Sequence, residues 1–296
     1  MRKRSSKTGS FLTAPVLVSI LILGIILFVS VFAPLLAQYD PDAIDFTSIR
    51  AMPSAQHWLG TDATGRDQFT RLMYGGRTSM INGLLVVLIA TVIGVPLGLI
   101  CGYYQGWIDT IIMRVTDFLL AFPPLLLAIV LVAGFGRSGK IAVIASGIVY
   151  TPGLIKIMRS MVLTERKAGY VEACRSMGYN DRRIMFLHIL PSCMPTMMVE
   201  LTLDFGYAII TLASMSFLGI GVQAPQSDWG TMLQEGFDLI FSSPWLALGP
   251  AIVIILVVIA VNVLSDGIQR YLDPGQCKLP SFATYRKRHA QKIDEV

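Results

Sequence analysis

The sequence has few charged residues for its length. Aspartate, glutamate, lysine and arginine make up 15% of the 296 residues, whereas hydrophobic residues make up 54%. A soluble domain carries roughly 25% charged residues. This chain would therefore expose too much apolar surface in water. The composition argues against a soluble protein and indicates lipid as the surrounding solvent.

Residues suited to metal binding and covalent catalysis are also scarce. The three histidines do not stand at metal-ligand spacing, and the four cysteines contain no CxxC pair: Cys101, Cys174, Cys193 and Cys277. This pattern gives no basis for a disulfide framework or a zinc site. In the topology set by the apolar segments, His57 and His188 lie on opposite sides of the membrane, so they cannot share a Ser/His/Asp site. We predict a chain that is not an enzyme and binds no cofactor itself.

One glycine-rich stretch, GFGRSGK at residues 134–140, has the G-x-x-x-x-G-K spacing of a phosphate-binding loop. Such a loop follows a strand, opens a helix, and has Ser or Thr after the lysine to hold magnesium. Here the stretch follows an apolar segment, and Ile141 comes after the lysine. We interpret it as a turn between spans, so ATP and magnesium are expected on partner subunits.

Six segments are long and apolar enough to cross a bilayer as helices, which takes about 20 residues each. They lie at residues 15–37, 80–101, 118–134, 141–158, 194–217 and 246–264. The predicted fold class is an all-α polytopic membrane protein with about six transmembrane helices. The first segment follows basic residues, as a signal peptide does. Its apolar run is longer than a signal's ~7–15 residues and lacks an A-x-A site, so we interpret it as an uncleaved anchor.

The positions of lysine and arginine predict the orientation. With the N-terminus in the cytoplasm, roughly three quarters of the 24 lysines and arginines fall on the inner side, as the positive-inside rule expects. Both termini are then cytoplasmic in a multi-pass inner-membrane protein. The basic residues are spread over the chain ends and one loop, so they indicate membrane lipid and not nucleic acid as the partner of these charges.

That loop, at residues 160–191, is predicted to fold as a helix–turn–helix elbow on the cytoplasmic face. Residues 171–177 have helical character, and Gly178 is placed to end this helix in the left-handed conformation. Asp181 can cap a second short helix, which Pro191 stops because it lacks an N–H and its ring clashes with the preceding turn.

The first helix of the elbow has features suited to a protein contact. Ala173 keeps one side slim, so another backbone could approach closely, and Glu172 and Arg175 offer charges to set the register. The alternative is an ordinary basic loop whose long side chains reach the lipid headgroups.

The spacing E-A-x-x-x-x-G, continued by L-P, resembles the EAA loop of ABC-importer permeases. In that family the loop forms a coupling helix that sits in a cleft of the nucleotide-binding subunit. The resemblance implies that the residues contacting the ATPase subunit are Glu172, Ala173, Cys174, Arg175 and Gly178. Two departures are Cys174, where the family usually has Ala, and Ser192, where its peptide branch has Asn.

Four further blocks resemble dipeptide/oligopeptide-type permeases in colinear order. They are HWLGTDATGRDQFTRLMYGGRTSM at residues 57–80, RVTDFLLAFPPLLLAI at 114–129, SFLGIGVQAPQSDWGTMLQE at 216–235 and NVLSDGIQRYLDP at 262–274. Together with the elbow, the resemblance covers residues 11–275 and is to the C-type permease of a peptide-importer pair.

The resemblance implies a set of partners and a division of the chain. The expected partners are a homologous permease, two ATP-binding subunits and an extracytoplasmic solute-binding protein, which residues 57–77 and 223–245 are placed to meet. The expected divisions are a tail, anchor and outer segment at 1–79, the permease domain at 80–275 and a basic tail at 276–296. Two alternatives remain open: the same transporter type for nickel or another non-peptide solute, and a passive channel.

Two acidic residues fall within an apolar segment. Glu200 and Asp204 lie one helical turn apart, on a face continued by Tyr207 and Thr211. Carboxylates in a membrane are costly and usually face a cavity or a partner. Glu200, Asp204 and Tyr207 are therefore candidates for the translocation path, where they would favour cationic or amine-bearing solutes. The alternative is pairing with polar groups on other helices or on the partner permease.

Two other acidic residues match positions of the family pattern, and one position departs from it. Asp117 and Asp266 stand where the family carries acidic residues, so we assign them structural roles. The family often has a glutamate where this chain has Leu212.

Overall fold

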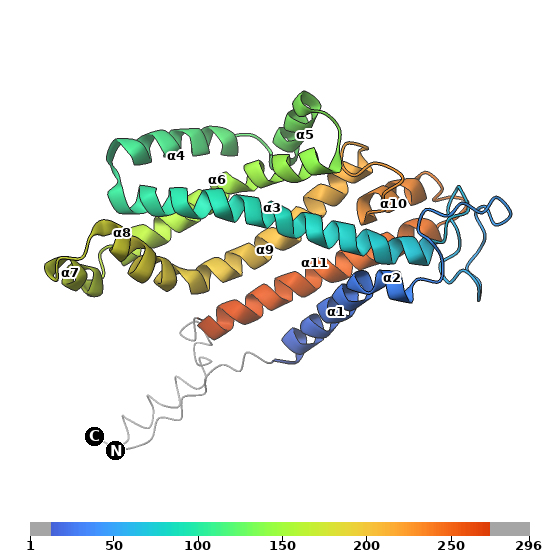
Figure 1. The fold of residues 1–296 in the computed structure, drawn as a ribbon, viewed down its shortest axis with the longest axis horizontal. Helices are drawn as coiled ribbons and strands as arrows, with labels where there is room; N and C mark the ends of the chain where they lie inside the picture. The colour runs from blue at the N-terminus through green and yellow to red at the C-terminus, as the bar shows by residue number, and fades with distance from the viewer. Residues whose placement is uncertain (1–12, 273–296) are drawn as a thin grey trace, which may run out of the picture.

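The computed structural model describes residues 13–272, which form the bundle of helices drawn in Figure 1. This part of the chain has no strand, and one isolated bridge joins Thr61 to Asp67. The elements are α1 (Ala14–Val31), α2 (Ala33–Leu36), α3 (Gln68–Tyr104), α4 (Gly106–Leu120), α5 (Pro124–Phe135), α6 (Gly139–Glu165), α7 (Gly169–Ser176), α8 (Asp181–Ile184), the π-helical turn η1 (Met185–Ile189), α9 (Leu190–Phe217), α10 (Trp229–Phe237) and α11 (Trp245–Leu272). The predicted all-α class is confirmed.

Five helical stretches in residues 13–272 are long and apolar enough to cross a membrane, and the bent pair α4 and α5 could supply a sixth. The five are α1, α3, α6, α11 and the continuous run Asp181–Phe217, which joins α8, η1 and α9. Their outward surfaces carry exposed large apolar side chains, such as Leu21, Val92 and Ile259. Lipid is the medium in which such surfaces are stable.

The span predicted at residues 118–134 is wrong as a single straight helix. α4 ends at Leu120, α5 begins at Pro124, and the two helices are bent by 94° relative to each other. Pro123 and Pro124 explain the break, because neither has an N–H to continue the ladder and each disfavours helical dihedrals in the residue before it. Hydropathy could not reveal the bend, since both halves are apolar.

The first predicted span is also interrupted. α1 ends at Val31, and the four-residue α2 continues the chain after Phe32. Pro34 has no N–H with which to extend the hydrogen-bond ladder of α1, so a new helix begins around it.

α3 is longer than the predicted span at residues 80–101. It begins at Gln68, where the Asp67 side chain accepts the N–H of Thr70 at 2.8 Å, and it runs for 37 residues. The division expected between residues 79 and 80 therefore falls within a continuous helix and is not a break in the fold.

Close contact between α3 and α6 forms the centre of the bundle. Glycines at four-residue spacing on α3 let the two backbones approach. A Cβ on Gly98 would lie 2.7 Å from the Ile155 carbonyl oxygen, and one on Gly102 would lie 2.6 Å from the Val162 Cβ. A larger residue at either position would force the helices apart. α3 and α6 therefore form one closely packed pair.

At the opposite end from the elbow, α10 lies across the ends of several spans (Figure 1). Its first residue, Trp229, is buried, and its Nε1 donates to the Leu72 carbonyl of α3 at 3.2 Å. Asp228 caps the helix by accepting the N–H of Thr231 at 2.7 Å. In Figure 1 the elbow lies at the other end of the bundle, while the end of α11 and the start of α1 pack against each other and both point away from α10. The two ends therefore differ in structure: one carries the elbow, and the other carries α10 and the segment before α3.

Candidate functional site

The first half of the elbow folds as the sequence predicts. α7 ends at Ser176, and Gly178 follows with a φ of 81°, in the left-handed region. The Gly178 N–H donates to the Arg175 carbonyl at 2.9 Å, and the Tyr179 N–H donates to the Cys174 carbonyl at 3.1 Å. These two bonds form a Schellman motif. The prediction that Gly178 ends this helix in the left-handed conformation is confirmed.

The second half of the elbow corrects two predictions. The cap is Asn180, whose side chain accepts the Arg183 N–H at 3.3 Å, and Asp181 is the first helical residue instead. Pro191 does not stop the helix. The chain passes through η1, where the Leu190 N–H donates to the Met185 carbonyl, and continues as α9. In this π-helical turn an N–H bonds to the carbonyl five residues earlier instead of four, which shifts the hydrogen-bond register of the helix. Pro191 then falls in the first turn of α9, where a missing N–H is tolerated.

Burial sorts the predicted contact residues into two groups. Glu172, Ala173, Arg175 and Gly178 are exposed, so their atoms are available to a partner. Cys174 is buried instead. We expected Cys174 at the ATPase contact with the others, but its side chain points into the bundle and holds α7 in place.

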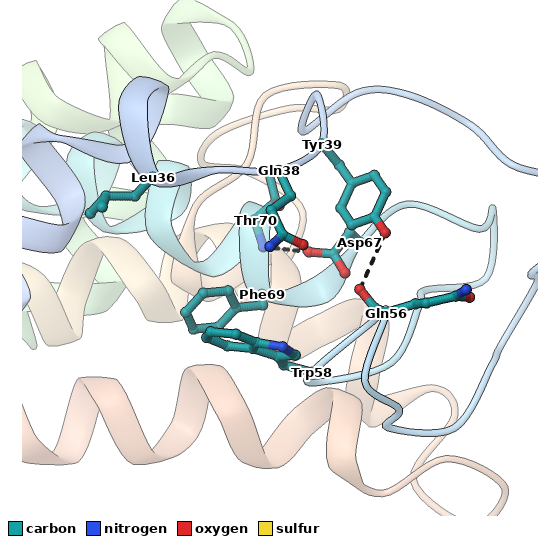
Figure 2. Close-up of a pocket in the computed structure, with 8 residues that line it drawn as sticks. All are labelled: Leu36, Gln38, Tyr39, Gln56, Trp58, Asp67, Phe69 and Thr70. Atoms are coloured by element: carbon teal, nitrogen blue, oxygen red, sulfur yellow. Dashed lines mark hydrogen bonds between the residues drawn. The ribbon is translucent and has the colours of Figure 1, made fainter.

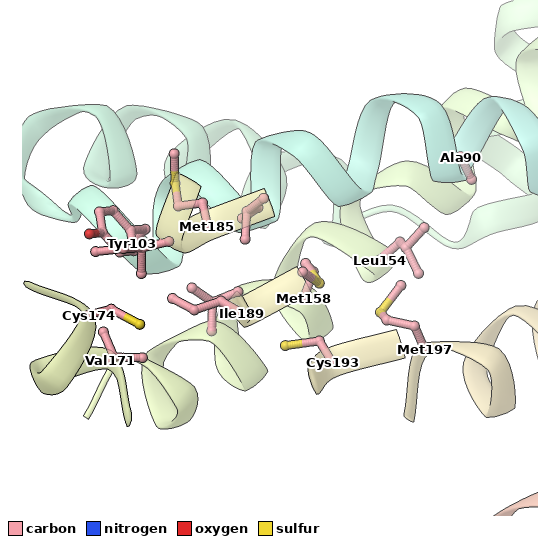
Figure 3. Close-up of a cluster of buried hydrophobic side chains, with 13 residues drawn as sticks. Ala90, Tyr103, Leu154, Met158, Val171, Cys174, Met185, Ile189, Cys193 and Met197 are labelled. Atoms are coloured by element: carbon pink, nitrogen blue, oxygen red, sulfur yellow. The ribbon is translucent and has the colours of Figure 1, made fainter. Parts of the chain in front are cut away.

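A cluster of buried side chains fixes the elbow to the spans (Figure 3). Val171 and Cys174 of α7 belong to the same cluster as Ile189 of η1 and Met158 of α6. All four are at most 5% exposed. The elbow is therefore a packed extension of the bundle, because moving α7 alone would uncover these apolar groups.

The acidic pair of α9 lies where the helical spacing predicts. Glu200 and Asp204 are half-buried, and Tyr207 on the same face is 53% exposed. Thr211, one turn further, shares a 2.8 Å hydrogen bond with the hydroxyl of Tyr150 on α6. Within residues 13–272 neither carboxylate has a hydrogen-bond or ion-pair partner. The described part of the chain thus leaves both carboxylates available to a solute or to another subunit.

An ion pair on the outside of the bundle joins α4 to α6. Lys156 Nζ and Asp117 Oδ1 are 2.6 Å apart, and the side chains are 44% and 59% exposed. Deeper in the same interface, Arg159 donates from Nε and Nη2 to the two carboxylate oxygens of Asp109, each at 2.6 Å. The structural role assigned to Asp117 agrees with its position between these helices.

The end opposite the elbow is rich in polar contacts. Asp67 accepts the Thr70 N–H through Oδ2, while its Oδ1 lies 2.9 Å from His57 Nδ1. Figure 2 shows Asp67 beside Tyr39, whose hydroxyl donates to the Gln56 carbonyl, in a shallow pocket. A larger cavity of about 330 Å³ lies nearby, between the segment before α3, α3 itself and the approach to α10. This end of the bundle therefore has a hollowed, polar surface.

The glycine-rich stretch at residues 134–140 is a turn between α5 and α6, as interpreted from the sequence. Gly136 has a φ of 107°, and the Ser138 hydroxyl caps α6 by accepting the Ile141 N–H at 3.3 Å. A helix precedes the stretch, so it lacks the strand that a phosphate-binding loop follows.

Sequence comparison assigns the fold to a family. Residues 94–276 match the model of the binding-protein-dependent transport system inner membrane component, and the chain belongs to this family of membrane permease subunits. It is 42% identical over 258 residues to a dipeptide transport system permease protein from Alkalihalophilus pseudofirmus, covering 87% of this chain and 85% of that protein.

Two further relatives carry related names. A glutathione transport system permease protein from Pectobacterium atrosepticum is 42% identical over 247 residues, which cover 83% of this chain and 82% of that protein. A probable D,D-dipeptide transport system permease protein from Escherichia coli K12 is 38% identical over 256 residues, or 86% of each chain. The family resemblance expected from the motifs is confirmed.

Proposed function

We propose that the chain forms half of the translocation pathway of an ATP-driven importer for peptides. A homologous permease would supply the other half, two ATP-binding subunits would drive the cycle, and an extracytoplasmic binding protein would deliver the solute. The exposed elbow carries this proposal, because a transport subunit without an ATP site needs a surface through which a partner can move it. The similarity to dipeptide and glutathione permeases supports peptides as the cargo.

The elbow has the properties that such a contact needs. Glu172 and Arg175 present opposite charges on exposed positions of a short helix, and Ala173 between them leaves room for a partner backbone. The inward face of the same helix is packed against the spans. Force applied to the exposed face would therefore reach the bundle, and the spans would shift between outward-open and inward-open arrangements. ATP and magnesium would bind on the partner subunits.

Orientation follows from the same assignment. The elbow, the end of α11 and the start of α1 all lie on the side of the bundle away from α10 (Figure 1). This side would face the cytoplasm, where lysine and arginine are concentrated. The end that carries α10 and the polar cavity would face the binding protein.

The translocation path is proposed along the face of α9 that carries Glu200, Asp204 and Tyr207. Carboxylates within a span are costly unless they face a cavity or a partner, and these have no ionic partner within residues 13–272. They would accept hydrogen bonds from the ammonium group of a peptide as it passes.

Two substitutions in the elbow test the coupling role. In proteoliposomes holding the complete complex, Glu172→Lys reverses an exposed charge, and Gly178→Pro replaces a residue whose φ of 81° proline cannot adopt. Both variants should insert normally and lose ATP-driven uptake. Gly169→Pro is the matched control, because Gly169 is the first residue of α7 and proline is tolerated there. Normal uptake by both elbow variants would refute the coupling role.

A second candidate cargo is glutathione, because the glutathione transport system permease protein of Pectobacterium atrosepticum is as similar to this chain as the dipeptide permease, at 42% identity each. Isothermal titration of the cognate binding protein with a dipeptide, glutathione and Ni²⁺ separates the three cargo classes. A reconstituted complex that moves solute without ATP would instead favour a passive channel.

A further inference from the structure

One side chain near the end of α3 contacts both halves of the elbow. Tyr103 is 3% exposed. Its hydroxyl donates to Asp181 Oδ1, at the start of α8, at 2.6 Å. The guanidinium carbon of Arg175, on α7, lies 5.5 Å from the centre of its ring. A buried aromatic ring beside a cation and a charged acceptor makes a strong, directional contact.

The ring also meets the segment that leads into the elbow. The guanidinium carbon of Arg166, directly after α6, lies 5.8 Å from the same ring centre. Tyr103 belongs to the apolar cluster that includes Val171 and Cys174 of α7 (Figure 3). Both halves of the elbow and the segment that leads into it therefore converge on one residue of α3, a helix to which the elbow has no direct chain connection.

We propose that Tyr103 is a positioning residue that couples the elbow to α3, so that displacement of α7 by the ATP-binding subunits moves α3 and α6 together. This inference rests on the proposed coupling role of the elbow. The chain itself links the elbow only to α6 and, through η1, to α9. Tyr103 adds the third link.

The structure of α3 explains why this link matters. The helix is one unbroken element of 37 residues that continues through Pro96, and at 1.5 Å per residue it spans ~55 Å. Its far end carries Arg71, which bonds to Glu235 of α10. Its middle is packed against α6 through Gly98 and Gly102. A push on the elbow can thus be carried from Tyr103 to the opposite end of the bundle without passing through α9.

The test is Tyr103→Phe in proteoliposomes that hold the complete complex and a dipeptide-loaded binding protein. Phenylalanine keeps the ring and its packing and removes the hydroxyl that reaches Asp181. The ATP-binding subunits should still co-purify, and ATP hydrolysis should continue. The amount of peptide taken up per ATP should fall about tenfold, which is the size expected for the loss of a hydrogen bond to a charged group. Tyr104→Phe is the control, because this neighbour is exposed. Unchanged uptake per ATP in Tyr103→Phe would overturn the proposal.

Variants at the acceptor separate coupling from general damage. Asp181→Ala removes the acceptor and should lower uptake per ATP as much as Tyr103→Phe does, whereas Asp181→Asn keeps an oxygen and should retain most of it. The Tyr103→Phe, Asp181→Ala double variant should be no worse than either single variant, because all three lose the same bond. Additive losses would overturn the link.

The elbow variants show which proposal has failed. If Glu172→Lys and Gly178→Pro leave uptake per ATP unchanged, the coupling role itself is wrong. If they abolish it and Tyr103→Phe does not, only the link through α3 is wrong.

Discussion

Arg71 and Asp62 are joined by a 2.6 Å contact between Nη1 and Oδ2, in a site where the arginine is only 1% exposed. Arg66 donates to the same carboxylate oxygen at 2.6 Å, and Glu235 of α10 accepts from Arg71 at 2.5 Å. Two arginines and two carboxylates thus form a charge-balanced network. It fastens the segment before α3 and the start of α3 to α10.

Replacing Arg71 by methionine should destabilise the protein by about 3 kcal/mol, because breaking a buried ion pair leaves an uncompensated charge. Thermal unfolding of the purified protein measures the change. Arg137→Met is the control, since Arg137 is exposed and no ion pair to it is seen within residues 13–272. Equal melting temperatures for the two variants would show that the network adds nothing.

The same network predicts a pH dependence. Burial by itself raises the pKa of Asp62, but the charge of Arg71 and the hydrogen bonds from Thr64 and Arg66 outweigh it, so the pKa of Asp62 lies below its ordinary value. A lowered pKa stabilises the fold above the unfolded pKa of about 4, and this contribution is lost as pH falls through the folded pKa. The difference in melting temperature between wild type and Asp62→Asn should therefore be constant near neutral pH and shrink below about pH 4. A difference that grows on acidification would contradict this account.

Two glycine substitutions, one in the contact between α3 and α6 and one on an open face of α1, should have opposite effects on stability. Gly98→Ala should destabilise the protein by about 2 kcal/mol, since the new Cβ would lie 2.7 Å from the Ile155 oxygen and the Met158 Cβ. Gly24→Ala, in α1, meets nothing within 4 Å and should stabilise by about 0.5 kcal/mol through helix propensity. Unfolding in denaturant, followed by tryptophan fluorescence, distinguishes the signs.

Neutralising the carboxylates of α9 tests the path. Glu200→Gln combined with Asp204→Asn should reduce uptake of cationic peptides about tenfold, the size expected for a charge-assisted hydrogen bond, and leave neutral peptides less affected. Co-purification of the partner subunits controls for assembly. Asp266→Asn is the matched substitution, because Asp266 is an exposed carboxylate of α11 outside the proposed path and outside the segments placed to meet the binding protein. Unchanged uptake of every accepted peptide would remove these residues from the path.

Local chemistry made part of the elbow predictable. Gly178 ends α7 because it reaches the left-handed region without strain, a property of the residue itself. Both Asn180 and Asp181 are good capping residues, so the sequence does not distinguish them. In the structure Asn180 caps α8, and the Asp181 carboxylate accepts the hydroxyl of Tyr103 on α3. Pro191 predicts the end of a helix. The shift of the hydrogen-bond register in η1 lets the helix continue through it, and no residue pattern in the sequence indicates that shift.

Other features needed the assembled bundle. The pair of prolines at 123 and 124 was a visible signal for the bend between α4 and α5, and apolar continuity masked it. Tyr103 lies 78 residues from Asp181 along the chain, and the sequence showed only an aromatic residue at the end of a span. The burial of Cys174 had a signal in the three-residue spacing from Val171, which places both on one face of α7.

The sequence alone determined the class of this protein: its apolar runs require lipid, its spaced motifs specify an importer permease, and its local turn residues form the elbow. Each of these depends on residues near one another in the chain, or on composition. Only the tertiary structure decided which face of the elbow is free, which helices the elbow contacts, and how the buried charges at the other end are balanced. Those outcomes depend on close contacts between segments far apart in sequence, and such contacts are selected by the packing of the whole bundle.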